Sequence, residues 1–220
     1  MQGAYRPGVE FGLPCWFGGT MAALHNLGRQ TFGNPDNKGN LPSREEVTLL
    51  LNEWVHNEKL RFHMEQVGTL MKTWAQKKGL NEKEVWLWEA TGLLHDADWD
   101  QWPDLHCGKI IAYGEEQGWD PDLLHGIASH GPAHFGVEPV SPLDHLIYAL
   151  DELSGFVHAV SLVRPGGYDG MSVKSVKKKM KEKSFAAQVS REEITDGASR
   201  AGIDLDELIA FVISVQREME

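Results

Sequence analysis

Start signals for α-helices recur along the chain from residue 43 to its end. Residues that cap helices stand three positions before a Glu, the spacing of a capping box, or directly before a proline, which is favoured in the first turn of a helix. These signals are Ser43 with Glu46, Asn81 with Glu84, Ser190 with Glu193, Asp120-Pro121 and Ser141-Pro142. Alternating strand patterns and Asn-Gly turns are missing from this stretch of sequence. The sequence therefore predicts an all-α fold.

Helical periodicity between these signals predicts nine helices and no internal repeat. We expect them at residues 43–56, 58–78, 82–96, 104–117, 121–129, 142–162, 172–182, 190–201 and 204–218. Residues 1–42 hold eight Gly and four Pro, too many for continuous regular structure. The expected organisation is a loop-rich arm at 1–42, with one short helix at Thr20–Arg29, and a helical domain at 43–220. The body or a second subunit of a homo-oligomer is expected to cover the apolar residues of the arm, which are Phe11, Trp16, Phe17, Met21 and Leu24.

Composition narrows the class of protein. The chain of 220 residues has 41% hydrophobic and 24% charged residues, which is typical of globular proteins, and no run long enough to span a membrane. Its first residues lack the form of a signal peptide, so we expect a cytoplasmic protein that does not bind membranes. With only Cys15 and Cys107, neither a disulfide framework nor a thiolate zinc site is expected. The net charge of −11 argues against binding of long nucleic acids.

Three polar residues fall on apolar faces of three different predicted helices. His63 shares a stripe with Leu60 and Val67, and His95 lies three residues after Gly92, where the missing side chain lets another backbone approach. Asp151 aligns with Ile147, Gly155 and His158. A single His on an apolar face is most often a hydrogen-bonded core residue. A buried unpaired carboxylate, in contrast, costs several kcal/mol unless it is paired or bound to metal. Because Asp96 directly follows His95, a shared divalent cation is the interpretation that explains all four residues.

The spacing of these four residues resembles that of a known protein family. A His on one helix, an adjacent His-Asp about thirty residues later and an Asp on a later helix resemble the HD superfamily of metal-dependent phosphohydrolases. The similarity covers about residues 57–163, which leaves 164–220 as a helical C-terminal extension, and "LLHDADWD" stands where relatives have an HDIG-type motif. The resemblance implies an HD-domain helical bundle in which His63, His95, Asp96 and Asp151 are metal ligands.

A second metal ion is implied by two further histidines. His106 and His130 resemble the additional ligands of binuclear HD proteins, in which the motif Asp, here Asp96, bridges both ions. His125 and His134 compete for that role, and His106 alone could also be a polar residue near a helix start. Imidazole and carboxylate ligands suit one or two ions of manganese, iron, nickel, cobalt or magnesium, and the sequence does not select among them.

Other residues near the motif have weaker assignments. The chain has Ala97-Asp98 in place of the family's Ile-Gly and lacks a following Lys, so a phosphate contact by such a Lys is not expected. Asp98 and Asp100 are expected in a solvated turn. Asp98 and His125 remain candidates, beside Asp96, for catalytic proton transfer, and Lys109 is a candidate for substrate binding. The basic segment Lys174–Lys183 is interpreted as a solvated helix face, with an anion-binding role as the alternative.

The function that the resemblance implies is hydrolysis of a phosphate ester in a small, nucleotide-like metabolite by metal-activated water. A di-iron oxygenase would use the same ligands and is the main alternative. A non-catalytic regulatory module is a further alternative, but loss of a ligand would be expected in such a protein. The expected partner is therefore a small phosphorylated metabolite.

Overall fold

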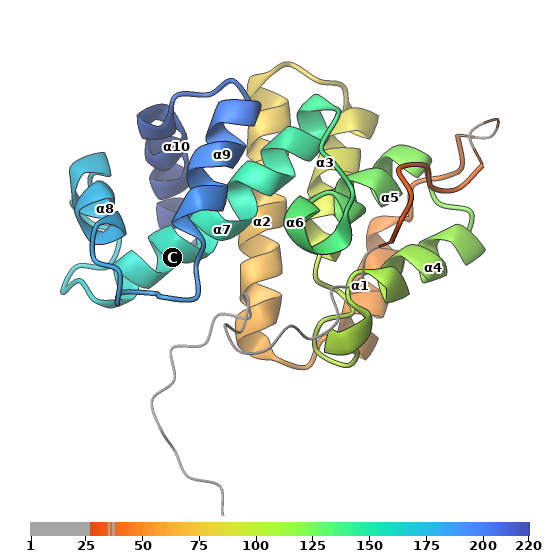
Figure 1. The fold of residues 1–220 in the computed structure, drawn as a ribbon, viewed down its shortest axis with the longest axis horizontal. Coiled ribbons are helices and arrows are strands. Elements are labelled where there is room, and N and C mark those ends of the chain that lie inside the picture. Colours follow the sequence, from red (N-terminus) through yellow and green to blue (C-terminus); the bar gives the residue numbers. More distant parts are fainter. Residues whose placement is uncertain (1–26, 35, 37) are drawn as a thin grey trace, which may run out of the picture.

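The computed structural model describes residues 27–34, 36 and 38–220, and every regular element in this part of the chain is helical (Figure 1). The elements are α1 Arg44–Trp54, α2 Glu58–Lys77, α3 Glu82–Leu94, a 3-10 turn at Pro103–Leu105, α4 Gly108–Glu116, α5 Pro121–Ala128, α6 Pro132–Phe135, α7 Pro142–Leu162, α8 Val173–Met180, α9 Arg191–Arg200 and α10 Leu205–Glu218. This architecture confirms the all-α class. None of the helices in the described residues combines the length and apolarity needed to cross a membrane.

Each of the nine helices predicted after residue 42 is present, but two details differ from the prediction. The segment expected as one helix at 104–117 is a 3-10 turn followed by α4, and His106 and Cys107 lie between the two. The short helix α6 was not predicted, because its four residues are too few for a periodic pattern and it ends at Gly136 with a φ of 68°. The predicted helix at Thr20–Arg29 lies mostly outside the described residues, as do the apolar residues of the arm between 11 and 24.

The predicted caps set most helix starts. Ser43 and Asn81 each form both hydrogen bonds of a capping box, and Ser141 does so with Asp144. Ser190 accepts a hydrogen bond from the backbone N–H of Glu193, without the reciprocal bond. Each cap satisfies backbone donors that the helix leaves unpaired, so these positions fix where the helices begin.

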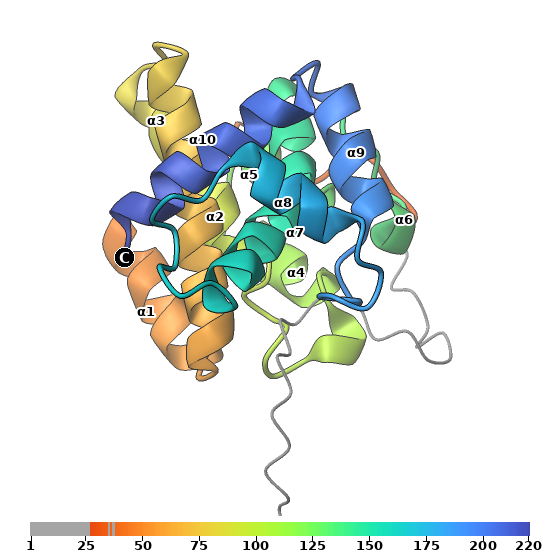
Figure 2. The same cartoon turned by 90° about the vertical axis from the view of Figure 1, so that its left-hand side faces the viewer.

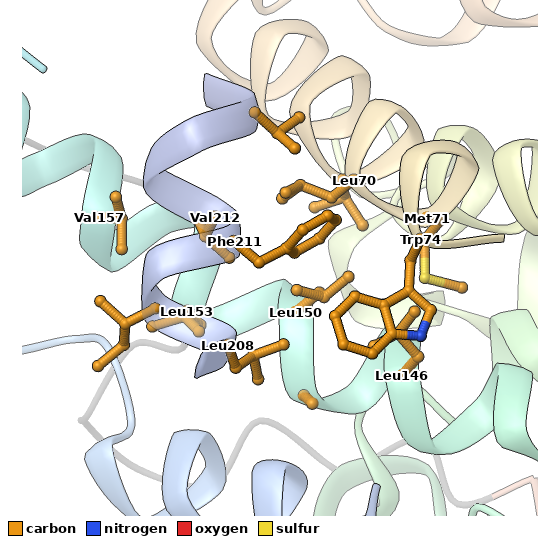
Figure 3. Close-up of a cluster of buried hydrophobic side chains, with 14 of the residues drawn as sticks. Leu70, Met71, Trp74, Leu146, Leu150, Leu153, Val157, Leu208, Phe211 and Val212 are labelled. Carbon is orange, nitrogen blue, oxygen red and sulfur yellow. The ribbon is translucent and has the colours of Figure 1, made fainter. Parts of the chain in front are cut away.

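The larger apolar cluster joins α2, α7 and α10. Its side chains converge from the three helices, with Leu70 and Trp74 from α2 facing Leu150 from α7 and Phe211 from α10 (Figure 3). The rings of Trp74 and Phe211 meet edge to face, with their centroids 4.9 Å apart. α8 and α9 cover α7 from the side opposite α3, so the C-terminal extension completes this core (Figure 2).

A second apolar cluster lies among α1, α3, α4 and α5. Residues 27–42 contribute to it, since Phe32 is buried, Asn40 forms a backbone bridge with Trp119, and Arg29 pairs with Glu115 at 2.6 Å. The described part of the predicted arm therefore packs on the helical body. α2 and α3 contribute side chains to both clusters. Around His63 on α2, Leu60 and Met64 belong to the second cluster, and Val67, one helical turn later, belongs to the first.

Close contact between α2 and α3 depends on two glycines. A Cβ atom added at Gly92 would lie 2.7 Å from the backbone nitrogen of Gly68 and 2.8 Å from its Cα. The two helices can therefore approach at this point only because neither residue has a side chain, which confirms the role predicted for Gly92. His63 precedes Gly68 on α2 and His95 follows Gly92 at the end of α3, so in this antiparallel pair both histidines lie toward the same end of the contact.

We predict that Gly92→Ala separates α2 from α3 and lowers the free energy of unfolding by about 2 kcal/mol or more, because a buried backbone clash cannot relax through side-chain rotation. Gly166→Ala is the matched control, since a Cβ there meets its nearest atoms at an ordinary 3.6 Å. Urea denaturation of both variants measures the difference. Equal stability of the two variants would contradict the close contact.

Candidate metal centre

Three sequence-distant segments bring buried imidazole and carboxylate groups together. His63 is on α2, Asp151 is on α7, and His95 caps the C-terminal end of α3. The Nε2 atom of His63 lies 2.9 Å from Oδ1 of Asp151 and 3.3 Å from Nε2 of His95. The Nε2 atom of His95 is 3.5 Å from the same carboxylate oxygen. All three side chains are buried, and their ligand atoms are close enough to bind one ion.

A second group forms around Asp96. Its Oδ1 atom lies 3.2 Å from Nε2 of His106 and 3.7 Å from Nε2 of His130, and these two nitrogens are 3.3 Å apart. The other carboxylate oxygen, Oδ2, lies 3.4 Å from Nε2 of His95 and 3.9 Å from Nε2 of His63. Asp96 therefore presents one oxygen to each group. This is the arrangement expected of a carboxylate that bridges two ions.

The turn after α3 places Asp96 between the groups. Backbone hydrogen bonds from Ala97 to Leu94 and from Trp99 to Asp96 continue the chain in tight turns beyond the helix end. Asp100 then accepts hydrogen bonds from the backbone N–H groups of His56 and Asn57, at 2.7 and 2.9 Å. Because Asn57 caps α2, Asp100 fastens the turn that carries Asp96 to the start of the helix that carries His63.

Hydrogen bonds on the outer side of the rings fix which nitrogen faces the centre. Nδ1 of His95 lies 2.8 Å from the carbonyl oxygen of Gly92, and Nδ1 of His130 lies 2.5 Å from that of Ile127. A carbonyl oxygen only accepts, so in both residues Nδ1 carries a proton, and each ring in its neutral form has its lone pair on Nε2. This nitrogen points at the neighbouring ligand atoms, as in metal-binding histidines. Burial would lower the pKa of His95, but Asp96 and Asp151 raise it well above its usual range, so without metal its Nε2 is protonated at neutral pH.

The donor set fits a pair of divalent ions. Two donors bound to one ion at about 2.1 Å, at angles of roughly 90° to 110°, lie about 3.0–3.4 Å apart. The distances within the two groups run from 2.9 to 3.7 Å. Buried lone pairs at this spacing repel one another unless a cation or proton lies between them. Nitrogen and oxygen donors without thiolate suit first-row transition metals and Mg²⁺, and the geometry does not select among these ions.

The ionisation of the site also favours a cation. Burial alone would raise the pKa of Asp96, but the positive charges of His95 and His106 outweigh it and hold that pKa well below its usual range. The pKa of Asp151 is likewise lowered, because hydrogen bonds from His63 and His95 outweigh burial. Both carboxylates are therefore negative at neutral pH. Positive charge at the centre stabilises them.

The pKa values of His106 and His130 are shifted in opposite directions. Burial would lower the pKa of His106, but the carboxylates of Asp98 and Asp96 raise it to about 9. Burial and the positive charges of His95 and His106 lower the pKa of His130 to about 4. In the protein without metal, His106 is thus a cation at pH 7 and His130 is neutral. Ion binding to the second group must displace a proton from His106.

The predicted solvated position of Asp98 is wrong. Asp98 is fully buried, and its two oxygens accept hydrogen bonds from Nδ1 of His106 at 2.6 Å and from the backbone N–H of Ile110 at 2.9 Å. The sequence offered a signal in the eight-residue separation of Asp98 from a candidate ligand, but not the reversal of the chain that brings them together. Asp98 therefore orients the ring of His106 so that Nε2 faces Asp96. Asp100 is partly exposed and has the structural role described above.

The structure places three other candidates outside both ligand groups. His125 pairs with Asp144 at 3.0 Å, and His134 lies 3.9 Å from Glu193. Lys109 is exposed, with its ammonium 5.4 Å from the centre of the Trp102 ring. The geometry therefore adds no support to a catalytic role for His125 or to substrate binding by Lys109, and both remain predictions from the sequence.

Sequence reasoning passed over Glu152, the residue after the candidate ligand Asp151. Its side chain is buried, Oε2 accepts a hydrogen bond from the backbone N–H of Ser190, and Oε1 has no hydrogen-bond partner. Burial and the negative charge of Asp151 raise the pKa of Glu152 to about 9, so it is protonated at neutral pH. Its adjacency to Asp151 was the only signal in the sequence, because a Glu in a helix is ordinarily solvated.

Comparisons with protein-family models, with curated proteins and with solved structures find no match for this chain.

We predict that two ions bind per chain and that Asp96→Ala abolishes both, because it removes the oxygen donor shared by the two groups. His130→Ala should reduce the count from two to one, since the group of His63, His95 and Asp151 remains. Elemental analysis at saturating metal measures the stoichiometry, with exposed Asp104→Ala as the control. A single ion in the unaltered protein would refute the shared site.

We predict that metal binding at pH 7.5 releases protons from His95 and His106, because nearby carboxylates raise the pKa of both rings against the effect of burial. The raised pKa of His106 means that proton competition weakens the second site at low pH, and affinity should rise until the pH reaches about 9. Calorimetry in buffers of different ionisation enthalpy measures the released protons. Asp98→Asn removes the leading cause of the raised pKa, so this variant should release fewer protons. Equal release from both proteins would contradict the assignment.

Proposed function

We propose that the protein is a metal-dependent phosphohydrolase of the HD superfamily that cleaves a phosphate ester in a small, nucleotide-like metabolite. The observation that carries the proposal is the buried carboxylate of Asp96, with one oxygen toward each of two histidine-containing groups. The sequence resemblance predicted this division of ligands from residues up to 88 positions apart, and the fold brings those residues together.

The ligands divide into two sets that share Asp96. His63, His95, Asp96 and Asp151 would hold one ion, and Asp96, His106 and His130 would hold the other. Divalent ions in such a pair lower the pKa of water toward neutrality and stabilise negative charge on the oxygens of a phosphate ester during hydrolysis. This chemistry requires no nucleophilic side chain from the protein.

The chain's own contribution is to hold and orient these groups. Asp98 keeps the Nδ1 proton of His106 and thereby directs Nε2 inward, and the carbonyl groups of Gly92 and Ile127 do the same for His95 and His130. Both oxygens of Asp98 are engaged, which favours an orienting role over its earlier assignment to proton transfer. The apolar clusters on both sides keep water from the outer faces of the rings.

The charge of the protein supports a small substrate. A net charge of −11 repels a long polyanion, whereas a single phosphate group needs only the local positive charge of the site. We therefore propose mononucleotides and related metabolites, in preference to DNA or RNA, as the substrate class.

We predict that phosphate release from at least one mono-, cyclic or dinucleotide in a panel depends on added divalent metal and stops with EDTA. Asp151→Ala should lower kcat/KM by about 100-fold or more, because loss of even a residue that orients a ligand typically costs 10- to 100-fold. Exposed Asp104→Ala is the control. Oxygen consumption with iron, without turnover of any phosphoester, would replace this proposal with the di-iron oxygenase.

A further inference from the structure

A cavity of about 620 Å³ opens beside the metal centre, between the start of α2, the end of α7 and residues 184–188. His63 lines this cavity and also belongs to the first ligand group, so the cavity and the metal centre share a wall. The volume lies within the range of about 300–1,000 Å³ that is usual for pockets that hold small molecules.

The wall of the cavity is mainly apolar and aromatic. Phe62 comes from α2, Phe185 from the segment before α9, and Leu162 and Val163 from the end of α7. Leu162 and Val163 are 57% and 50% exposed, so the apolar lining continues to the surface of the protein. The lone cation among the described residues of the wall is Lys59, which follows Glu58 in the sequence. The cavity is therefore suited to an uncharged, flat group.

The outer wall belongs to the C-terminal extension and is held by Arg191. This guanidinium donates hydrogen bonds to the backbone carbonyl groups of Phe185, Ala186 and Val189, and it lies 4.7 Å from the centre of the Phe156 ring. Ala186 has a φ of 42°, a backbone conformation that residues with side chains rarely adopt. The segment thus has a defined conformation, which the partly buried side chain of Arg191 holds through three hydrogen bonds.

A hydrogen-bond network on the opposite wall determines which ring nitrogen of His158 carries the proton. Gln216 donates from Nε2 to the carbonyl of Ser154, so its Oε1 accepts the proton of the Tyr168 hydroxyl at 3.2 Å. Tyr168 has only one proton, and Nδ1 of His158, 3.0 Å from the same hydroxyl, must donate to it. In its neutral form His158 therefore has a lone pair on Nε2, and this ring lines the cavity.

We propose that this cavity binds the nucleobase of the substrate, an inference that rests on the proposed function and names the part of the substrate that the protein recognises. A base is flat and uncharged, so it matches a cavity lined by the rings of Phe62 and Phe185, and its N–H groups can donate to Nε2 of His158. The phosphate of the same molecule then extends past His63 to the metal centre. The C-terminal extension acquires a role in substrate recognition.

Binding of nucleosides tests this assignment without any dependence on metal or turnover. Adenosine, guanosine, cytidine and uridine are titrated into the full-length protein in EDTA and followed by calorimetry or ligand-observed NMR. At least one should bind with a Kd of about 1 mM or tighter, and ribose, which has no base, should not bind. Absence of nucleoside binding would overturn the base-binding cavity and leave the phosphohydrolase proposal standing. Nucleoside binding without turnover of any phosphoester would support the base-binding cavity and contradict the phosphohydrolase proposal.

Two variants locate the bound nucleoside. Ala159→Phe places a ring in the cavity and should weaken binding at least tenfold, whereas Ala112→Phe, at an exposed position of α4, should not change it. His158→Phe keeps the ring and removes the acceptor, so binding should weaken by about tenfold. If Ala159→Phe does not fold, the affinity of the His158→Phe variant shows whether the nucleoside binds in this cavity. Unchanged affinity in a folded Ala159→Phe or His158→Phe variant would place the nucleoside elsewhere and refute the proposal.

Discussion

The negative charge of Asp96 and Asp151, between two apolar clusters, is the constraint on which the rest of the structure depends. Two carboxylates in such a place destabilise the fold unless positive charge lies beside them. The chain places imidazole rings around both, and it directs Nε2 of those rings inward through hydrogen bonds on their outer nitrogens. α2, the end of α3 and α7 each present one of these side chains at the same point.

Much of this organisation was predictable because it depends on local chemistry. Capping residues mark where helices start, and a period of 3.6 residues identifies which face of a helix is buried. His63, His95 and Asp151 could be assigned to inward faces in this way, without knowledge of how the helices pack. Gly92 was informative for the same reason, since a residue without a side chain on a buried face indicates close contact between helices.

The remaining features depend on contacts that the sequence does not encode locally. Asp98 looked like part of a solvated turn because a polar run before Trp-Pro usually is one, yet the chain reverses and pairs it with His106. The break between the 3-10 turn and α4 positions His106 but has no periodic signature. The cavity beside His63 is made by segments more than 100 residues apart, so only the assembled fold reveals it.

Anomalous X-ray scattering from crystals of the protein loaded with manganese tests the central claim most directly. We expect two peaks separated by about 3.5–4 Å, with one oxygen of Asp96 beside each peak. His63, His95 and Asp151 should surround one peak, and His106 and His130 should surround the other. A single peak, or two peaks of which only one lies beside Asp96, would contradict the shared carboxylate and with it the binuclear centre.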